Sequence, residues 1–232
     1  MKTGLVLEGG AMRGIYTAGV LDVFLEHGIH FDGVIGVSAG ALHGCSFVSE
    51  QKGRSLRYIK KYRNDKHFMS WWSFLHTGEV VGKQFCYHDI PERLDPFDYE
   101  AFVKSDTDFY ATCTNVETGK AEYIKITDML SQIDAMRASA SMPYVSKIVD
   151  YNGMKLLDGG CADSIPVEAF YKMGYERLVV VLTREAGFVK KPENAKMAEI
   201  RYHKYPEFVQ ALQNRHVVYN HTAVEKILAA ID

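Results

Sequence analysis

The chain has 232 residues, of which 47% are hydrophobic and 24% are charged. This composition is typical of a globular protein with a sizeable core, and it excludes a disordered, collagen-like or disulfide-stapled chain. The 27 basic and 29 acidic residues give a formal net charge of −2, so the sequence does not favour nucleic acid or a general affinity for anionic membranes. The length favours a single domain over residues 1–232.

Cysteine usage and the amino terminus bear on the compartment. None of the cysteines has zinc-ligand spacing, and a core of this size needs no disulfide staples, so we expect reduced thiols and a cytoplasmic setting. They are Cys45, Cys86, Cys113 and Cys161. The first apolar run, residues 5–7, is too short for a signal peptide or a membrane span. Any contact with a membrane surface would therefore be transient and made from the aqueous side.

Four predicted elements follow one another in the first 50 residues. The apolar run Leu5-Val6-Leu7 predicts a buried strand, and apolar residues at helical spacing predict a helix over 14–27 that stops at Gly28. Residues 34–37 predict a second buried strand, and a helix is expected just after Ser38. This alternation predicts a three-layer α/β/α fold with a mainly parallel central sheet.

The later elements are less regular. Residues 109–113 and 122–126 predict two strands, and a helix is expected from Thr127 to Ala140. The pair Asn152-Gly153 predicts a tight hairpin between strands at 147–149 and 154–157. Residues 178–182 predict a further strand, and helical spacing runs from Pro206 to the end.

A glycine-rich loop joins the first predicted strand to the first predicted helix. Its sequence is Gly9-Gly10-Ala11-Met12-Arg13-Gly14. The amides of such a turn, with the positive end of the helix dipole, form a site for negative charge. A dinucleotide site is disfavoured, because Ala11 replaces the second glycine of that motif and Asp32 precedes the second strand. An oxyanion hole and a purely structural turn both remain open.

A second motif, Gly36-Val37-Ser38-Ala39-Gly40, matches G-x-S-x-G between a predicted strand and a predicted helix. This context is what a nucleophile elbow requires, because Gly36 and Gly40 allow a sharp turn that presents the Ser38 hydroxyl. The alternative is a helix N-cap serine without chemistry.

A nucleophilic serine needs a neighbouring base, and the nine histidines offer one set of choices. A Ser-His-Asp triad could be completed by His203, His216 or His221, although none of them lies in a recognisable turn after a strand. His43 would point away from Ser38 on an ideal helix. We therefore interpret the histidines as surface or capping residues.

The motif Asp158-Gly159-Gly160 offers a carboxylate instead. It follows the second hairpin strand, and Gly159 and Gly160 allow the backbone to approach another segment closely. In a partly desolvated cleft the pKa of Asp158 should rise, which makes it a better proton acceptor near neutral pH. Its structural alternative is a glycine-rich turn with an Asx-type hydrogen bond.

The three motifs, in this order, resemble the patatin-like phospholipase family. Two further stretches are similar to it, the sequence RASASMP at 137–143 and DSIPV at 163–167. The resemblance covers residues 3–185. It implies a patatin-like fold that hydrolyses acyl esters of lipids without a metal or other cofactor. Ser38 would be the nucleophile and Asp158 its proton acceptor.

The resemblance also implies that the amides of Gly10 and Ala11, within the loop from Gly9 to Gly14, form the oxyanion hole, and that Arg13 helps to fix the shape of the loop. Ala11 replaces the family's usual glycine, which costs about 1 kcal/mol if the position needs a positive φ. Similar bacterial proteins continue beyond the point that corresponds to Asp232, so the carboxyl-terminal part is expected to be incomplete or covered by a partner.

Two other functions use the same residues. One is acyl transfer to an acceptor other than water, and the other is a catalytically weak lipid-binding or regulatory module. The aromatic stretch at 67–75 is interpreted as core, with a lid or an interfacial contact as its alternative. The sequence does not indicate an oligomeric state.

Overall fold

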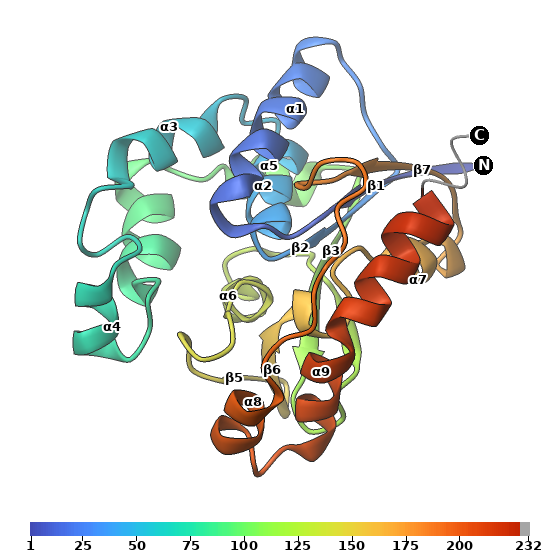
Figure 1. Ribbon diagram of the computed structural model, residues 1–232. Coiled ribbons are helices and arrows are strands. Elements are labelled where there is room, and N and C mark those ends of the chain that lie inside the picture. The colour runs from blue at the N-terminus through green and yellow to red at the C-terminus, as the bar shows by residue number, and fades with distance from the viewer. Residues whose placement is uncertain (228–232) are drawn as a thin grey trace.

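The computed structural model describes residues 1–227, and within this range the side chains of all residues except 195 and 224–226 (Figure 1). The described strands form one mixed seven-stranded sheet flanked by helices, in the order β5-β6-β3-β2-β1-β7, with β4 paired to β3. They are β1 (Lys2–Leu7), β2 (Gly33–Val37), β3 (Asp108–Asn115), β4 (Ala121–Lys125), β5 (Val149–Tyr151), β6 (Met154–Asp158) and β7 (Tyr175–Val181). Strands β1, β2, β3 and β7 run parallel, and β4, β5 and β6 pair antiparallel.

The α-helices are α1 (Gly14–Glu26), α2 (Ala39–Val48), α3 (Arg54–Tyr62), α4 (Trp71–Thr77), α5 (Tyr99–Lys104), α6 (Ile133–Ser139), α7 (Val167–Lys172), α8 (Ala195–Arg201) and α9 (Pro206–Asn220). Residues Phe85–Leu94 and His221–Ile227 form π-helical segments. No helix among the described residues is both long and apolar enough to cross a membrane.

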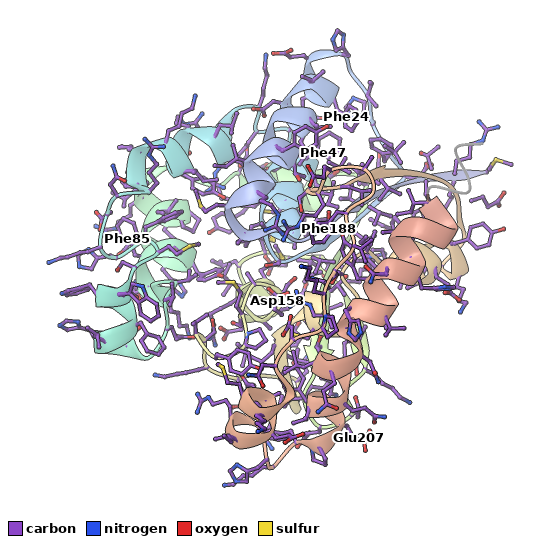
Figure 2. All side chains as sticks on the ribbon, viewed as in Figure 1. Phe24, Phe47, Phe85, Asp158, Phe188 and Glu207 are labelled. Atoms are coloured by element: carbon purple, nitrogen blue, oxygen red, sulfur yellow. The ribbon has the colours of Figure 1, made fainter. Side chains whose placement is uncertain are left out.

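Successive residues of β1 point to opposite faces of the sheet, and both faces are covered. Leu5 and Leu7 pack in a core beneath α1 and α2, whereas Val6 packs in a core on the other face with Phe170 of α7 and Tyr219 of α9. Figure 1 shows α1 and α2 on one side of β1 and β2 and α7 and α9 on the other. In the first core, Phe24 of α1 and Phe47 of α2 meet with ring centroids 6.5 Å apart (Figure 2).

The register of β3 brings together the ends of two strands that are distant in sequence. Val37, the last residue of β2, pairs with Thr112 of β3, and the next residue of β3, Cys113, pairs with Asp158 at the end of β6. Ser38 follows Val37 directly. Because β4 occupies the opposite edge of β3 at Thr112 and Cys113, β2 and β6 follow one another along the same edge. The sheet therefore places Ser38 and Asp158 next to each other on one edge of β3.

The predicted three-layer α/β fold and its early elements are confirmed, and three later expectations need correction. The first hairpin strand, expected at 147–149, is β5 at Val149–Tyr151, because its pairing with β6 begins at Val149. The helix expected over 127–140 is confined to α6, because the side chains of Asp128 and Gln132 hydrogen-bond backbone amides of residues 127–131 and form a turn instead. The helical spacing after Pro206 divides into α9 and the π-helical segment that follows it. Its last five positions, 228–232, lie outside the described residues.

Candidate active site

Ser38 occupies a strained turn between β2 and α2. Its backbone angles are φ 54° and ψ −122°, a conformation that residues other than glycine rarely adopt. Ser38 is the N-cap residue of α2, but its side chain makes no capping hydrogen bond. The hydroxyl therefore does not cap α2, as that of a purely structural N-cap serine would.

The glycines on either side of Ser38 are needed for close packing. A Cβ atom on Gly40 would lie 2.5 Å from the carbonyl oxygen of Leu7, and one on Gly36 would lie 2.5 Å from the backbone nitrogen of Ala41. Both separations are far below van der Waals contact. Gly36 and Gly40 therefore allow α2 to begin directly against the ends of β1 and β2.

Asp158 ends β6 and is held by its own glycines. The backbone N–H of Gly160 donates a 2.8 Å hydrogen bond to Oδ1 of Asp158, so the Asx-type contact of the structural alternative is present. A Cβ atom on Gly159 would lie 2.2 Å from the carbonyl oxygen of Thr112, so only glycine lets this turn pack onto β3. Both Ser38 and Asp158 are buried, with 7% and 6% of their surface exposed.

The electrostatic surroundings of Asp158 link it to Ser38. Desolvation on burial raises the pKa of Asp158 above its ordinary value. Hydrogen bonding from the Ser38 side chain is the largest of the effects that oppose this rise, followed by the Gly160 amide and the charge of Arg215. The structure thus brings together the two side chains that the motifs single out, and it gives the carboxyl a raised pKa, as expected.

The glycine-rich loop lies beside Ser38. A Cβ atom on Gly9 would lie 3.2 Å from Cβ of Ser38, and one on Gly14 would lie 2.8 Å from Cβ of Ala39. Within the described residues, the amides of Gly10 and Ala11 donate no hydrogen bond. They are therefore unpaired donors in the loop next to the serine.

Two features of this loop bear on the expectations for Ala11 and Arg13. Ala11 has φ 47°, so the position does adopt the left-handed conformation for which glycine is favoured. The guanidinium of Arg13 makes no hydrogen bond or ion pair with any described residue. Instead, Thr183 holds the loop, because its hydroxyl donates to the carbonyl of Gly9 at 3.1 Å and its amide donates to the buried carboxylate of Glu8.

His203, His216 and Asp32 have local structural contacts, whereas the interpretation as a surface or capping residue is wrong for His43. His203 and His216 contact carbonyl oxygens of the preceding turn, at Ile200 and Gln213. His43 is buried in α2, where its Nε2 atom would lie 3.0 Å from a Cβ atom on Gly14, and burial lowers its pKa to about 4. Asp32 precedes β2 and accepts hydrogen bonds from the amide and hydroxyl of Thr3, at 2.6 and 2.8 Å.

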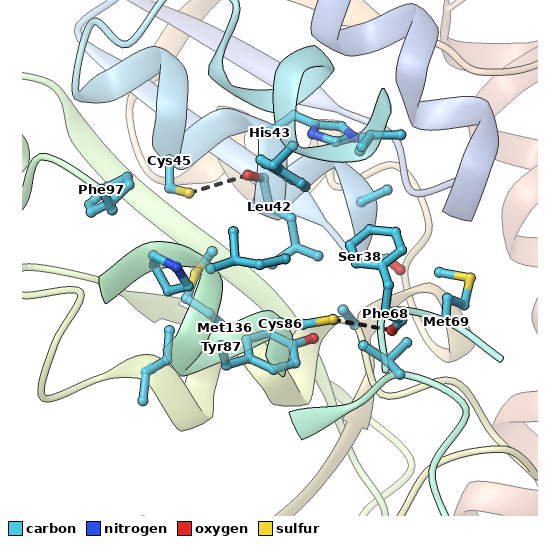
Figure 3. Close-up of a pocket in the computed structure, with 18 of the residues that line it drawn as sticks. Ser38, Leu42, His43, Cys45, Phe68, Met69, Cys86, Tyr87, Phe97 and Met136 are labelled. Atoms are coloured by element: carbon cyan, nitrogen blue, oxygen red, sulfur yellow. Dashed lines mark hydrogen bonds between the residues drawn. The ribbon is translucent and has the colours of Figure 1, made fainter. Parts of the chain in front are cut away.

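An apolar pocket opens beside Ser38 (Figure 3). Its cavity volume is about 130 Å³, and Ala11 and Met12 of the glycine-rich loop form part of its wall. Other lining residues include Leu42, Phe68, Tyr87, Met129 and Met136. A flexible aliphatic chain bound in this pocket would contact mainly carbon and sulfur atoms.

The aromatic stretch at 67–75 contributes to both the pocket and the surface. Phe68 is buried and lines the pocket with Met69, so the core interpretation holds for that end of the stretch. It is wrong for Trp71 and Leu75 on α4, which are 71% and 80% exposed. These side chains are exposed because α4 is a short helix that packs on the protein through its buried Ser73.

Ser139 is a site residue whose role the motifs do not indicate. Its hydroxyl accepts the backbone N–H of Ser38 at 3.0 Å and donates to the carbonyl of Thr112 at 2.7 Å. It therefore ties the serine turn to β3. The only sequence signal for it is the RASASMP stretch, which indicates similarity to a family but assigns no contact.

Comparison with known proteins also relates a long part of the chain to patatin-like phospholipases. The family model described as patatin-like phospholipase matches residues 5–171. Uncharacterized protein YjjU of Escherichia coli is 29% identical over 203 residues, which cover 85% of this chain and 56% of that protein. Lysophospholipase NTE1 of Debaryomyces hansenii and neuropathy target esterase sws of Drosophila melanogaster are each 28% identical, over 78% and 77% of this chain.

This chain spans little more than half of the bacterial relative and 12% of each of these two eukaryotic relatives. The matched segment nevertheless contains the end of β1 from Leu5, the glycine-rich loop, Ser38 and Asp158. With the model matched over well more than half of its residues, the chain belongs to the patatin-like phospholipase family.

Proposed function

We propose that this chain is a serine acyl hydrolase of lipid esters, of the phospholipase A type, that uses a Ser38–Asp158 dyad. The observation that carries the proposal is the pairing of β2 and β6 with the same edge of β3, which leaves Ser38 beside the buried Asp158 at an apolar pocket. The family supports lipid esters as substrates, and two of the relatives are named as a lysophospholipase and an esterase.

In the proposed mechanism Asp158 accepts the proton of the Ser38 hydroxyl while the serine oxygen attacks the ester carbonyl. The free amides of Gly10 and Ala11 stabilise the negative charge that develops on the carbonyl oxygen. The alcohol leaves with a proton from Asp158, and an acyl-serine remains. Water then gives a proton to Asp158 and attacks the carbonyl of the acyl-serine. Asp158 returns this proton to the oxygen of Ser38 as the bond to the acyl group breaks, which releases the fatty acid and restores Ser38.

The apolar pocket accounts for the acyl part of the substrate. It is lined by Met12 of the glycine-rich loop and by residues of several helices, so a chain bound there would have its carbonyl next to Ser38.

The four cysteines are free thiols, which supports the expected reducing, cytoplasmic setting.

The experiment that tests the dyad is labelling with a fluorophosphonate probe combined with hydrolysis of a lysophospholipid. Ser38→Ala should abolish labelling and reduce turnover by a factor of about 10⁶, and Asp158→Asn should reduce both strongly while the protein remains folded. Ser49→Ala is the matched control, because Ser49 is a buried serine whose hydroxyl contacts Ser46 and Gln51 outside the site. Near-normal hydrolysis by Asp158→Asn would contradict the proposal.

The two alternatives give different results in the same assays. An acyltransferase would form a new ester when alcohols are added, at the expense of free fatty acid. A lipid-binding module without turnover is favoured by the strained Ala11, and it would bind lipid without labelling at Ser38.

We also propose that α4 makes a transient contact with a membrane surface. Trp71 and Leu75 are exposed on α4, while Met69, just before this helix, lines the pocket beside Ser38. Trp71→Ser/Leu75→Ser should lower hydrolysis of lipid in vesicles more than hydrolysis of a soluble short-chain ester. Equal effects on both substrates would contradict the membrane contact.

A further inference from the structure

Four cations that influence one another electrostatically lie outside the apolar pocket, and the proposed mechanism uses none of their side chains. Arg13 comes from the glycine-rich loop, Arg184 and Lys190 come from the connection between β7 and α8, and Arg215 comes from α9. Below they are called the cationic cluster. None of the four lines the apolar pocket. Their function is not explained by the hydrolytic mechanism above.

Aromatic rings and backbone hydrogen bonds hold two of these cations in place. The guanidinium of Arg184 lies 4.2 Å from the ring centroid of Phe188, and Nζ of Lys190 lies 4.9 Å from that of Tyr219. The two rings meet edge to face with centroids 5.9 Å apart. Asn220 exchanges two side-chain hydrogen bonds with the backbone of Lys190, at 2.8 and 3.0 Å. The cations therefore belong to an ordered surface.

The four cations of the cluster face three carboxyl groups, those of Glu8, Glu193 and Asp158, so positive charge exceeds negative charge. Glu193 pairs with Arg215 at 2.9 Å. The carboxylate of Glu8 accepts hydrogen bonds from the Thr183 amide and the Tyr219 hydroxyl. Among the described residues, Arg13, Arg184 and Lys190 form no ion pair with a carboxylate.

Burial and the neighbouring cations act in the same direction on the pKa of Lys190, whereas the charges of Glu193 and Glu8 oppose them. Desolvation, and then the positive charge of Arg215, lower the pKa of Lys190 to about 8. Desolvation, and then the charge of Arg184, also lower the pKa of Arg13. A bound anion would relieve this repulsion, because it would lie among several cations at once.

The cationic cluster adjoins the dyad. A Cβ atom on Gly160 would lie 3.1 Å from Oδ1 of Asp158 and 3.3 Å from Nη2 of Arg215. In the glycine-rich loop, Met12 lines the apolar pocket and the next residue, Arg13, belongs to the cluster. An ester bound at Ser38 would thus have apolar side chains around its acyl chain and cations near its alcohol part.

We propose that the cationic cluster binds the phosphate of a glycerophospholipid whose ester lies at Ser38, so that substrates with a negatively charged head group are preferred over uncharged ones. This inference rests on the proposed function for the identity of the ester, and it assigns Arg184 and Lys190 as residues that determine specificity. Both lie beyond residue 171, where the family match ends.

The first test measures binding without turnover. In the Ser38→Ala protein, the Kd of octanoyl-glycerol-3-phosphate is compared with that of octanoyl-glycerol by calorimetry, below the concentrations at which either forms micelles. We expect the phosphate-bearing lipid to bind about 10- to 100-fold more tightly. Arg184→Gln/Lys190→Gln should remove most of this difference. Lys191→Gln, which neutralises an exposed lysine next to Lys190, is the matched control and should retain it.

A phosphate arm and a turnover arm complete the test. Inorganic phosphate should bind much more weakly than the phosphate-bearing lipid, and equal affinity would show that the cluster binds free phosphate instead. In the protein with Ser38 intact, the double variant should lower the ratio of kcat/KM for the anionic lipid to kcat/KM for the neutral lipid by about 10-fold or more. The ratio cancels any effect of these charges on Asp158, because that effect is common to both substrates.

Failure of this inference and failure of the proposed function give different results. A preference for the phosphate-bearing lipid that survives in the double variant would overturn the role of the cluster, whether or not the protein is a hydrolase. Absence of hydrolysis would overturn the proposed function, but the binding difference in the Ser38→Ala protein would still support the cluster as the site for the phosphate.

Discussion

The hydroxyl of Ser139 accepts a hydrogen bond from the backbone N–H of Ser38 at 3.0 Å, and it donates one to the carbonyl of Thr112 at 2.7 Å. Ser139 is fully buried at the end of α6. A buried amide that loses its acceptor is costly, so this bond helps to maintain the strained backbone of Ser38. The position of the proposed nucleophile therefore depends on a residue from a different element.

The first prediction concerns this bond. Ser139→Ala should lower the free energy of unfolding by about 1–3 kcal/mol, because the Ser38 amide is left buried without a partner. It should also lower kcat by about 10- to 100-fold through displacement of Ser38. Ser141→Ala is a suitable control, because it also removes a buried hydroxyl that bonds a carbonyl, that of Arg137. Equal kcat values for the two variants would show that the Ser38–Ser139 bond has no positioning role.

The second prediction concerns Ala11 and its φ of 47°. Ala11→Gly should change the free energy of unfolding by less than about 1 kcal/mol, because relief of the left-handed strain is offset by the greater freedom of glycine in the unfolded chain. Ala11→Val should destabilise the protein by about 1–2 kcal/mol, because a β-branched residue is strongly disfavoured at positive φ. Chemical denaturation of the three proteins measures the difference. A valine variant as stable as the glycine variant would contradict the left-handed conformation.

The third prediction concerns the turn after Asp158. Gly159→Ala places a Cβ atom 2.2 Å from the Thr112 carbonyl oxygen, so β6 and β3 must separate locally. We expect a loss of several kcal/mol in the free energy of unfolding, or no folded protein. Gly19→Ala on α1 is the control, because a Cβ atom there meets no atom within 4 Å and alanine favours the helix by about 0.5–1 kcal/mol. Thermal unfolding compares them, and similar Tm values would be incompatible with this packing.

The fourth prediction concerns the acid side of the pH–rate profile. Asp158 accepts a proton only when it is ionised, so kcat/KM should be retained above its pKa and lost as the pH falls through it. Because desolvation raises this pKa, the loss should occur at a higher pH than for an ordinary aspartate. Arg215 opposes the rise, so Arg215→Gln should move the acid limb to still higher pH. Lys191→Gln is the control. If it shifted the acid limb as far as Arg215→Gln, Arg215 would have no specific effect on Asp158.

Much of the fold could be predicted because its signals are local. The apolar runs at β1 and β2 are each followed by a glycine turn, and Asn152-Gly153 joins β5 to β6 as expected. The polar turn at 127–131 was not anticipated, because the side chain of Gln132 replaces helical hydrogen bonds there. Exposure of Trp71 was also not indicated, since composition alone does not show which side of a helix faces the protein.

In the candidate site, too, local motifs predict some features, whereas others depend on contacts between distant segments. Ser38 and Asp158 can be proposed from motifs, but their proximity depends on the register of β3 with both β2 and β6, which no local pattern specifies. The loop provides a second example. The sequence predicts that Arg13 fixes its shape, but the hydrogen bonds that hold it come from Thr183, two residues beyond the end of β7. Contacts of this range become visible only in the folded chain.

The place of β7 bears on how the protein can be dissected. β7 begins after residue 171, where the family match ends, but it is hydrogen-bonded along the whole of β1. A fragment cut at that boundary would keep both members of the dyad while leaving the apolar β1 as an unprotected sheet edge, a surface prone to self-association. It would also lose the Thr183 clamp on Gly9. The smallest piece worth expressing is therefore longer than the segment by which the family is recognised.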